Sequence, residues 1–253
     1  MKIAVTGKGG VGKTTLASLI ITHFAGSGKR VIAVDADPDA NLAQALGFSD
    51  IDKIVPISQM ESLIEERTGA KPGKSGSIFK LNPVVDDLPE KLSIRKDNIY
   101  LMVMGTVRKG GAGCICPEST LLKSLITHLV LFQNDIIVMD MEAGIEHLGR
   151  GTASGVDLLL IVVEPGLRSI GTAGAIKALS ADLGIKNIAV VGNKIRSAAD
   201  EEFIRKNIEN IEIIGFIPYD EKIIESDMQG KSAKLNISCN MEGIFNSISS
   251  MVK

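Results

Sequence analysis

The sequence predicts an α/β fold, with a doubly wound, mostly parallel sheet of seven or eight strands and helices on both faces. Short runs of aliphatic residues recur along the chain, and helix-like stretches separate them. The runs are apolar throughout instead of alternating, which is typical of strands buried on both faces of a parallel sheet. The expected strands lie at residues 3–6, 31–34, 99–104, 136–140, 158–163, 188–191 and 213–217.

Amphipathic spacing predicts helices between and after these strands. Apolar residues recur at helical intervals in three stretches: Leu16, Leu19, Ile20 and Phe24; Ala173, Ile176 and Leu179; and Met241, Ile244, Phe245, Ile248, Met251 and Val252. We expect the last stretch to be a terminal helix that docks on the core. The repeated strand–helix alternation predicts a single domain over residues 1–253. The exception is the region of about 48–97, where charges, prolines and glycines predict a helical or irregular excursion without a clear strand.

Composition excludes several functional classes. The chain has 253 residues, of which 45% are hydrophobic, enough for a sizeable core. The 28 basic and 30 acidic residues give a net charge of -2, which argues against a dedicated nucleic-acid binder. No apolar run approaches the ~20 residues of a membrane span, so we expect no membrane partner. Three cysteines with no secretory signal before them are too few for a disulfide framework and predict a reducing, cytoplasmic location.

A phosphate-binding loop follows the first expected strand. Residues 7–15 contain the motif G-x-x-x-x-G-K-[ST], at positions 7–14, and lie between a buried strand and an amphipathic helix, where this motif must lie. Lys13 is expected to bridge the β- and γ-phosphates of a nucleotide, and the Thr14 hydroxyl to ligate Mg²⁺. The other expected nucleotide contacts are Gly9, Gly10, Val11, Gly12 and Thr15. The sequence therefore predicts a nucleotide-binding protein of the P-loop NTPase class.

Carboxylates follow two further strands. Asp35, Asp37 and Asp39 come at the end of the second strand, and Asp140 ends an apolar strand in the manner of a Walker B element. The carboxyl ends of parallel strands border the crevice in which α/β proteins bind ligands. We therefore expect Asp140 to hold Mg²⁺ through water. Asp37 and Asp39 have an alternative interpretation, as caps of a helix that begins near Leu42.

The loop carries a second lysine, Lys8, which an ordinary phosphate loop does not need. The segment K-G-G-V-G-K-T-T resembles the deviant Walker A family of ATPases, which includes MinD, ParA and the nitrogenase iron protein. The resemblance implies a homodimer in which Lys8 reaches the partner's nucleotide as a finger supplied in trans. The alternative is a solvated loop lysine.

The same resemblance extends to both switch segments. Residues 35–41 are similar to the family's switch I, which implies that Asp37 orients or deprotonates the attacking water and that Asp35 lies near the magnesium shell. Residues 140–146, D-x-x-A-G-I-E, resemble switch II of the MinD branch. Gly144 would sense the γ-phosphate there with its backbone N–H.

The nucleotide base is expected to be adenine. Asn193 and Lys194 follow one strand and Pro218 ends another, and both segments resemble the family's adenine-side elements. An Asn amide can donate to and accept from adenine together. A guanine-reading N-K-x-D is incomplete, because Arg196 stands where Asp is required. ATP is therefore the expected nucleotide, with Mg²⁺.

Cys114 and Cys116 form a C-x-C pair in a glycine-rich segment. Such thiolates suit Zn²⁺, Ni²⁺ or an iron–sulfur cluster, but two ligands do not close a tetrahedral site. A twofold dimer would bring four, so we expect one metal shared by two protomers. Two buried structural thiols are the alternative, and Cys239 is expected to be an inert packed thiol.

The cysteines also separate branches of the family. G-x-G-C at 111–114 resembles the first cluster-ligating segment of the nitrogenase iron protein, but residues 140–150 lack that protein's second cysteine. Together with the loop and switch II, C-x-C looks like the CooC-type maturation ATPases. This resemblance implies an ATP-hydrolysing metallochaperone that delivers nickel to carbon monoxide dehydrogenase, with no nucleic-acid partner. The alternatives are an iron–sulfur ATP-dependent reductase and a MinD- or ParA-like positioning ATPase.

Overall fold

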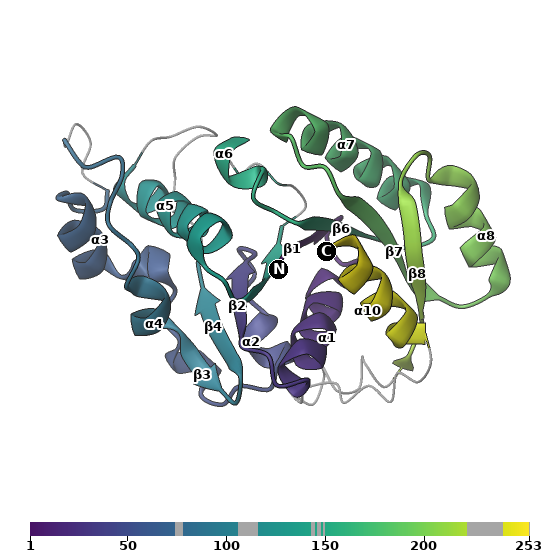
Figure 1. Ribbon diagram of the computed structural model, residues 1–253, viewed down its shortest axis with the longest axis horizontal. Coiled ribbons are helices and arrows are strands. Elements are labelled where there is room, and N and C mark those ends of the chain that lie inside the picture. Colours follow the sequence, from purple (N-terminus) through teal and green to yellow (C-terminus); the bar gives the residue numbers. More distant parts are fainter. Residues whose placement is uncertain are drawn as a thin grey trace.

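The computed structural model describes residues 1–73, 78–105, 116–142, 145, 148, 150–221 and 240–252. Eight strands form one sheet in the order β3-β4-β2-β5-β1-β6-β7-β8 (Figure 1). All neighbouring pairs are parallel except β3 and β4. The predicted fold class is confirmed. The strands are β1 (Lys2–Gly7), β2 (Val31–Ala36), β3 (Ile94–Lys96), β4 (Ile99–Val103), β5 (Ile136–Met141), β6 (Leu158–Val163), β7 (Ile188–Ile195) and β8 (Glu212–Pro218).

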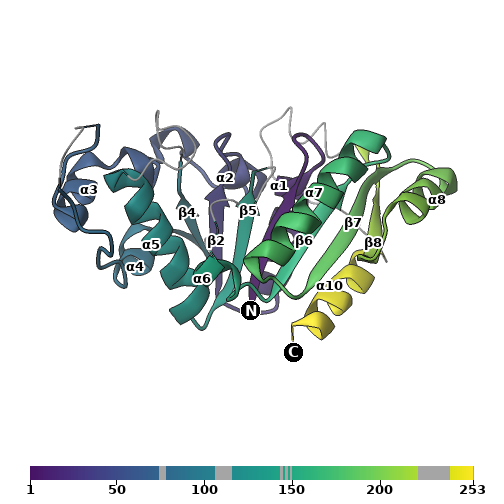
Figure 2. The same ribbon diagram turned by 90° about the horizontal axis from the view of Figure 1, so that it is seen from above.

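Helices cover both faces of this sheet, as Figures 1 and 2 show. Residues of α3, α4, α5, α6, α7 and α8 belong to one buried apolar cluster, and residues of α1, α2 and α10 to the other. Successive residues of a strand point to opposite clusters: Ile3 and Val5 of β1 to one, Ala4 to the other. The helices are α1 (Lys13–Gly26), α2 (Leu42–Ala45), α3 (Glu61–Thr68), α4 (Leu88–Leu92), α5 (Pro117–Phe132), α6 (Arg150–Ala153), α7 (Leu167–Leu183), α8 (Ala198–Asn207) and α10 (Asn240–Met251).

Residues 48–97 contain short helical segments and, at the end of the region, a strand that the sequence pattern does not reveal. Outside residues 74–77 the region contains two short 3₁₀ turns (Ile51–Lys53 and Ile57–Gln59), α3, α4 and, at its end, β3. The β3 strand turns at Asp97, whose φ of 52° is left-handed, and pairs antiparallel with β4. Its three residues, Ile-Arg-Lys, are too short and too charged to form the apolar run that revealed the other strands.

The terminal helix docks on the core as predicted. Met241, Ile244, Phe245 and Ile248 of α10 are buried, in the same cluster as the apolar face of α1. Phe245 stacks on His23 of α1, with 3.8 Å between the ring centroids. In the part of the chain that the structure describes, no helix has the length and apolar character that crossing a bilayer requires.

Candidate nucleotide site

Glycines fix the path of the loop between β1 and α1. Gly7 has a φ of 149°, and a Cβ there would collide with the carbonyl oxygen of Val162 on β6. Gly12 has a φ of 97°, and a Cβ there would collide with the side-chain amide nitrogen of Asn193 on β7. The loop therefore passes against two neighbouring strands before α1 begins.

The N-terminus of α1 is open toward the loop. Its N-cap, Gly12, supplies no side-chain cap, and the first turn of α1 contains no acid. The first N–H groups of a helix lack intrahelical partners and carry the positive end of the helix dipole, so this end is suited to an anion. Lys13, the first helical residue, is buried, and its Nζ lies 3.6 Å from Oδ2 of Asp37. The loop thus brings Lys13 and Asp37 together, as the sequence predicts for a phosphate site.

Asp35 and Asp140 lie side by side on β2 and β5, in register, and both are fully buried. The Asp35 carboxylate accepts the backbone N–H of Leu42 at 2.9 Å and, more weakly, that of Asp37 at 3.3 Å. Burial raises the pKa of Asp35 to about 7, against the opposing effect of the Leu42 hydrogen bond. The cap at the start of α2 is thus supplied by Asp35, and not by Asp37 or Asp39.

Asp140 differs in its partners. Neither of its carboxylate oxygens has a hydrogen-bond partner among the described residues. Burial raises its pKa to about 6, and the Thr14 side chain and the charge of Lys13 partly oppose this rise. A buried carboxylate that no backbone N–H reaches, next to the Thr14 hydroxyl, is a donor set that suits a hard divalent cation. The residues present therefore fit Mg²⁺.

Asp37 and Asp39 stay closer to solvent. Asp37 Oδ1 accepts the backbone N–H of Asp39 at 3.0 Å, which leaves Oδ2 toward Lys13. Asp39 is exposed, and its backbone carbonyl accepts a hydrogen bond from the Asn41 side chain. Of the two, only Asp37 faces the loop lysine.

A charged network joins the loop to β6 and β7. Lys8 Nζ lies 3.4 Å from Glu164 Oε1, and Lys194 Nζ lies 3.2 Å from Glu164 Oε2. Lys194 also donates to the carbonyl oxygen of Gly10 at 2.6 Å. Glu164 is absent from the residues predicted above, although it directly follows β6 at the same sheet edge as Asp35 and Asp140. Strand-end position was the signal that could have revealed it.

Asn193 of β7 holds the phosphate loop through its side-chain amide. Its side-chain Nδ2 donates to the carbonyl oxygen of Val11 at 2.7 Å, and its Oδ1 accepts the backbone N–H of Lys194 at 2.8 Å. Lys194 has a left-handed φ of 59°. Both ends of the Asn193 amide thus have partners within the protein. Pro218 ends β8 and is exposed, and the roles predicted for these residues at adenine stay predictions.

Cys116 is the one cysteine of the C-x-C pair within the described residues. It is half-buried and caps α5: its Sγ accepts the backbone N–H of Ser119 at 3.4 Å, and Ser119 Oγ accepts its backbone N–H at 3.3 Å. Cys114, Cys239 and Gly144 lie outside the described residues. Within those residues, no group of three or more metal-binding side chains is present.

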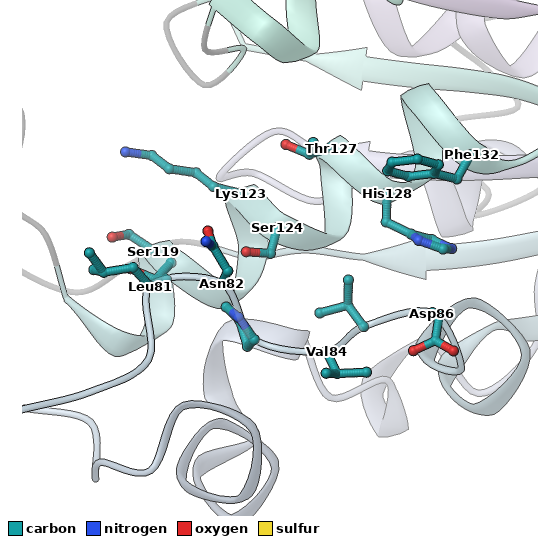
Figure 3. Close-up of a pocket in the computed structure, with 13 residues that line it drawn as sticks. Leu81, Asn82, Val84, Asp86, Ser119, Lys123, Ser124, Thr127, His128 and Phe132 are labelled. Carbon is teal, nitrogen blue, oxygen red and sulfur yellow. The ribbon is translucent and has the colours of Figure 1, made fainter.

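A separate cavity of about 520 Å³ lies between residues 81–86 and α5. Figure 3 shows Asn82, Val84 and Asp86 on one side and α5 residues such as Lys123, Ser124 and His128 on the other. None of the predicted site residues lines it. The nucleotide site is therefore assigned from the loop and strand ends, not from this cavity.

Comparison with known proteins agrees with this geometry. The protein-family model for the CobQ/CobB/MinD/ParA nucleotide binding domain matches residues 2–233. The chain is 50% identical to an uncharacterized ATP-binding protein of Methanocaldococcus jannaschii, over 98% of this chain and 97% of that protein. It is 47% identical to the carbon monoxide dehydrogenase accessory protein CooC of Rhodospirillum rubrum, over 92% and 89%. A chain of the MinC:MinD cell division protein complex of Aquifex aeolicus has a similar structure, with a TM-score of 0.68, 26% identity and coverage of 98% of this chain and 94% of that chain.

Proposed function

Because the chain belongs to the CobQ/CobB/MinD/ParA family of nucleotide-binding domains, we propose that it is a dimeric ATPase that inserts nickel into carbon monoxide dehydrogenase. The observation that carries this proposal is the 47% identity, over 92% of the chain, to a carbon monoxide dehydrogenase accessory protein. The C-x-C pair supports it, because an insertion protein needs thiolates that hold the metal and can release it.

ATP would bind at the loop between β1 and α1. The N–H groups of Gly9, Gly10, Val11 and Gly12 would surround the phosphates, and Thr15 would continue this contact into the first turn of α1. Lys13 would contact the β- and γ-phosphates. Mg²⁺ would be held by Thr14 and Asp140, with Asp35 farther from it, and would neutralise phosphate charge when bound.

Hydrolysis requires a water molecule in line with the γ-phosphate. Asp37 is the carboxylate that faces Lys13, so it is suited to orient that water. Gly144 would sense the γ-phosphate. Lys8 would reach the partner's nucleotide and neutralise charge that develops during phosphoryl transfer. Asn193, Lys194 and Pro218 would lie on the adenine side.

Nickel is the cargo in this proposal, with zinc as a competing occupant of the same thiolates. Cys114 and Cys116 would supply two ligands and the same pair of the second protomer the other two. The Cys116 sulfur already accepts a backbone N–H at the start of α5, the end of a helix at which negative charge is stabilised. Nucleotide would control metal release by binding the two dimer arrangements with different affinity.

Metal analysis tests the shared site. Protein purified without oxygen, with ADP or with ATP, should contain about one nickel or zinc ion per dimer, the number that a tetrahedral C-x-C site allows. The double variant C114A/C116A should lose this metal and keep ATP binding, because neither cysteine belongs to the phosphate loop. C239A is the matched control, with one cysteine removed elsewhere, and should keep its metal.

The outcome separates the candidate functions. If C114A/C116A retains its metal, the shared site is wrong. If the purified protein instead contains iron and the broad visible absorption of a cluster, the reductase alternative replaces the nickel proposal. Delivery is tested with nickel-free carbon monoxide dehydrogenase, which should gain activity with nickel-loaded protein and ATP but not with ADP.

A further inference from the structure

We infer that Glu164 is a positioning residue that holds Lys8 on its own protomer, and that Lys194 allows its release. The inference rests on the proposed role of Lys8 at the partner's nucleotide. In the structure the Lys8 ammonium does not extend away from its own chain but lies 3.4 Å from Glu164 Oε1. To act in trans, Lys8 must first leave this carboxylate.

The second oxygen of Glu164 explains how that can happen. It lies 3.2 Å from Lys194 Nζ, so one carboxylate binds two lysines, one at each oxygen. A partly buried carboxylate that loses its counter-ion pays a desolvation penalty. Because Lys194 stays, Glu164 keeps a cationic partner when Lys8 leaves, and the release of Lys8 is correspondingly easier.

Lys194 and Glu164 are themselves fixed in place. Lys194 donates to the Gly10 carbonyl at 2.6 Å, and its backbone N–H is held by the side chain of Asn193. The backbone N–H of Glu164 donates to Ser169 Oγ at 3.1 Å, at the beginning of α7. The Lys8 ammonium, in contrast, has Glu164 as its one partner among the described residues, and a Cβ on the neighbouring Gly9 would meet no described atom within 4 Å. Lys8 is therefore the movable member.

The contact between Lys8 and Glu164 is weak enough for the partner's nucleotide to replace it. The Lys8 and Glu164 side chains are 38% and 26% exposed, and ion pairs this accessible are weak. A nucleotide phosphate of the partner carries more negative charge than one carboxylate and can compete for Lys8. Glu164 thus helps to set the protomer concentration at which two nucleotide-bound protomers dimerise.

Two substitutions should shift this concentration in opposite directions. E164Q removes the competing charge, so the protomer concentration for half-maximal dimerisation with ATP should fall about 2- to 30-fold, because each dimer no longer has to break two accessible ion pairs. K194M leaves Glu164 with Lys8 alone, so the same concentration, measured with each variant saturated by nucleotide, should rise by a similar factor. Sedimentation with a non-hydrolysable ATP analogue measures both, and thermal unfolding checks that each variant is folded.

The double variant K8A/E164Q separates this inference from the proposed function. K8A should dimerise more weakly with the analogue than the unmodified protein, and E164Q should have no further effect in the K8A background. If K8A weakens dimerisation but E164Q and K194M shift it in the same direction or not at all, the role of Glu164 is wrong and that of Lys8 stands. If K8A dimerises normally, the trans role of Lys8 fails, and the inference fails with it.

Discussion

Asp35 and Asp140 are two carboxylates at the same depth in the protein with different partners. They face each other in register on β2 and β5, and both are completely buried. Asp35 accepts the backbone N–H groups of Leu42 and Asp37, whereas the oxygens of Asp140 have no partner among the described residues. Burial alone does not distinguish them. The difference indicates that Asp35 holds the backbone at the start of α2, whereas Asp140 has no such structural task, which fits the magnesium role proposed for it.

The largest effect is expected from D140N. The amide keeps the volume of the side chain and removes the charge that would hold Mg²⁺. We expect ATP turnover to fall by about 10²- to 10³-fold, the usual effect of removing one charge-stabilising group from an active site. Turnover measured over a magnesium titration checks this. The exposed Asp52 offers the matched control: D52N makes the same chemical change away from the loop and should hydrolyse ATP normally.

If D140N hydrolyses ATP at the normal rate, Asp140 has no metal role and the comparison with Asp35 loses its functional meaning. If D35N loses as much activity as D140N, both carboxylates belong to the magnesium site, and the distinction between a structural and a ligand-binding acid is wrong.

Asp35 and Asp140 should also make the stability of the protein depend on pH. This effect should be measurable for both acids and smaller than the loss of turnover in D140N. Burial raises the pKa of Asp35 to about 7 and that of Asp140 to about 6. The folded state therefore binds these protons more tightly than the unfolded state, whose Asp pKa is about 4. Stability contributed by these groups is present below pH ~4 and declines as the pH rises through the folded pKa values.

The measurement is denaturant unfolding across this pH range without magnesium. The stability difference between the unmodified protein and D35N should fall from pH ~4 to ~7 and then become constant. D140N should move the upper end of this decline to lower pH, because the charge of Asp140 also raises the pKa of Asp35. A difference that rises with pH would show that Asp35 is stabilised in its charged form.

Much of the fold could be predicted from the sequence, because buried parallel strands are continuous apolar runs. The β3 strand could not, since an antiparallel edge strand of three residues needs neither length nor apolar character. The loop and the strand-end acids were also predictable. The partners were not: the contact of Asn193 with Val11 spans 182 positions, and only the completed sheet brings β7 next to the loop.

The smallest expected effect is a difference in stability between the alanine variants of Asp35 and Asp140. D35A removes the acceptor of the Leu42 N–H, which lies buried at the start of α2, and an unsatisfied buried donor costs about 1–3 kcal/mol. D140A deletes the same atoms at the same depth but breaks no such hydrogen bond. We therefore expect D35A to lower the free energy of unfolding by about 2 kcal/mol more than D140A at neutral pH without magnesium, measured by denaturant unfolding. Equal losses would mean that the cap on α2 contributes nothing, and that the two carboxylates differ only in what binds to them.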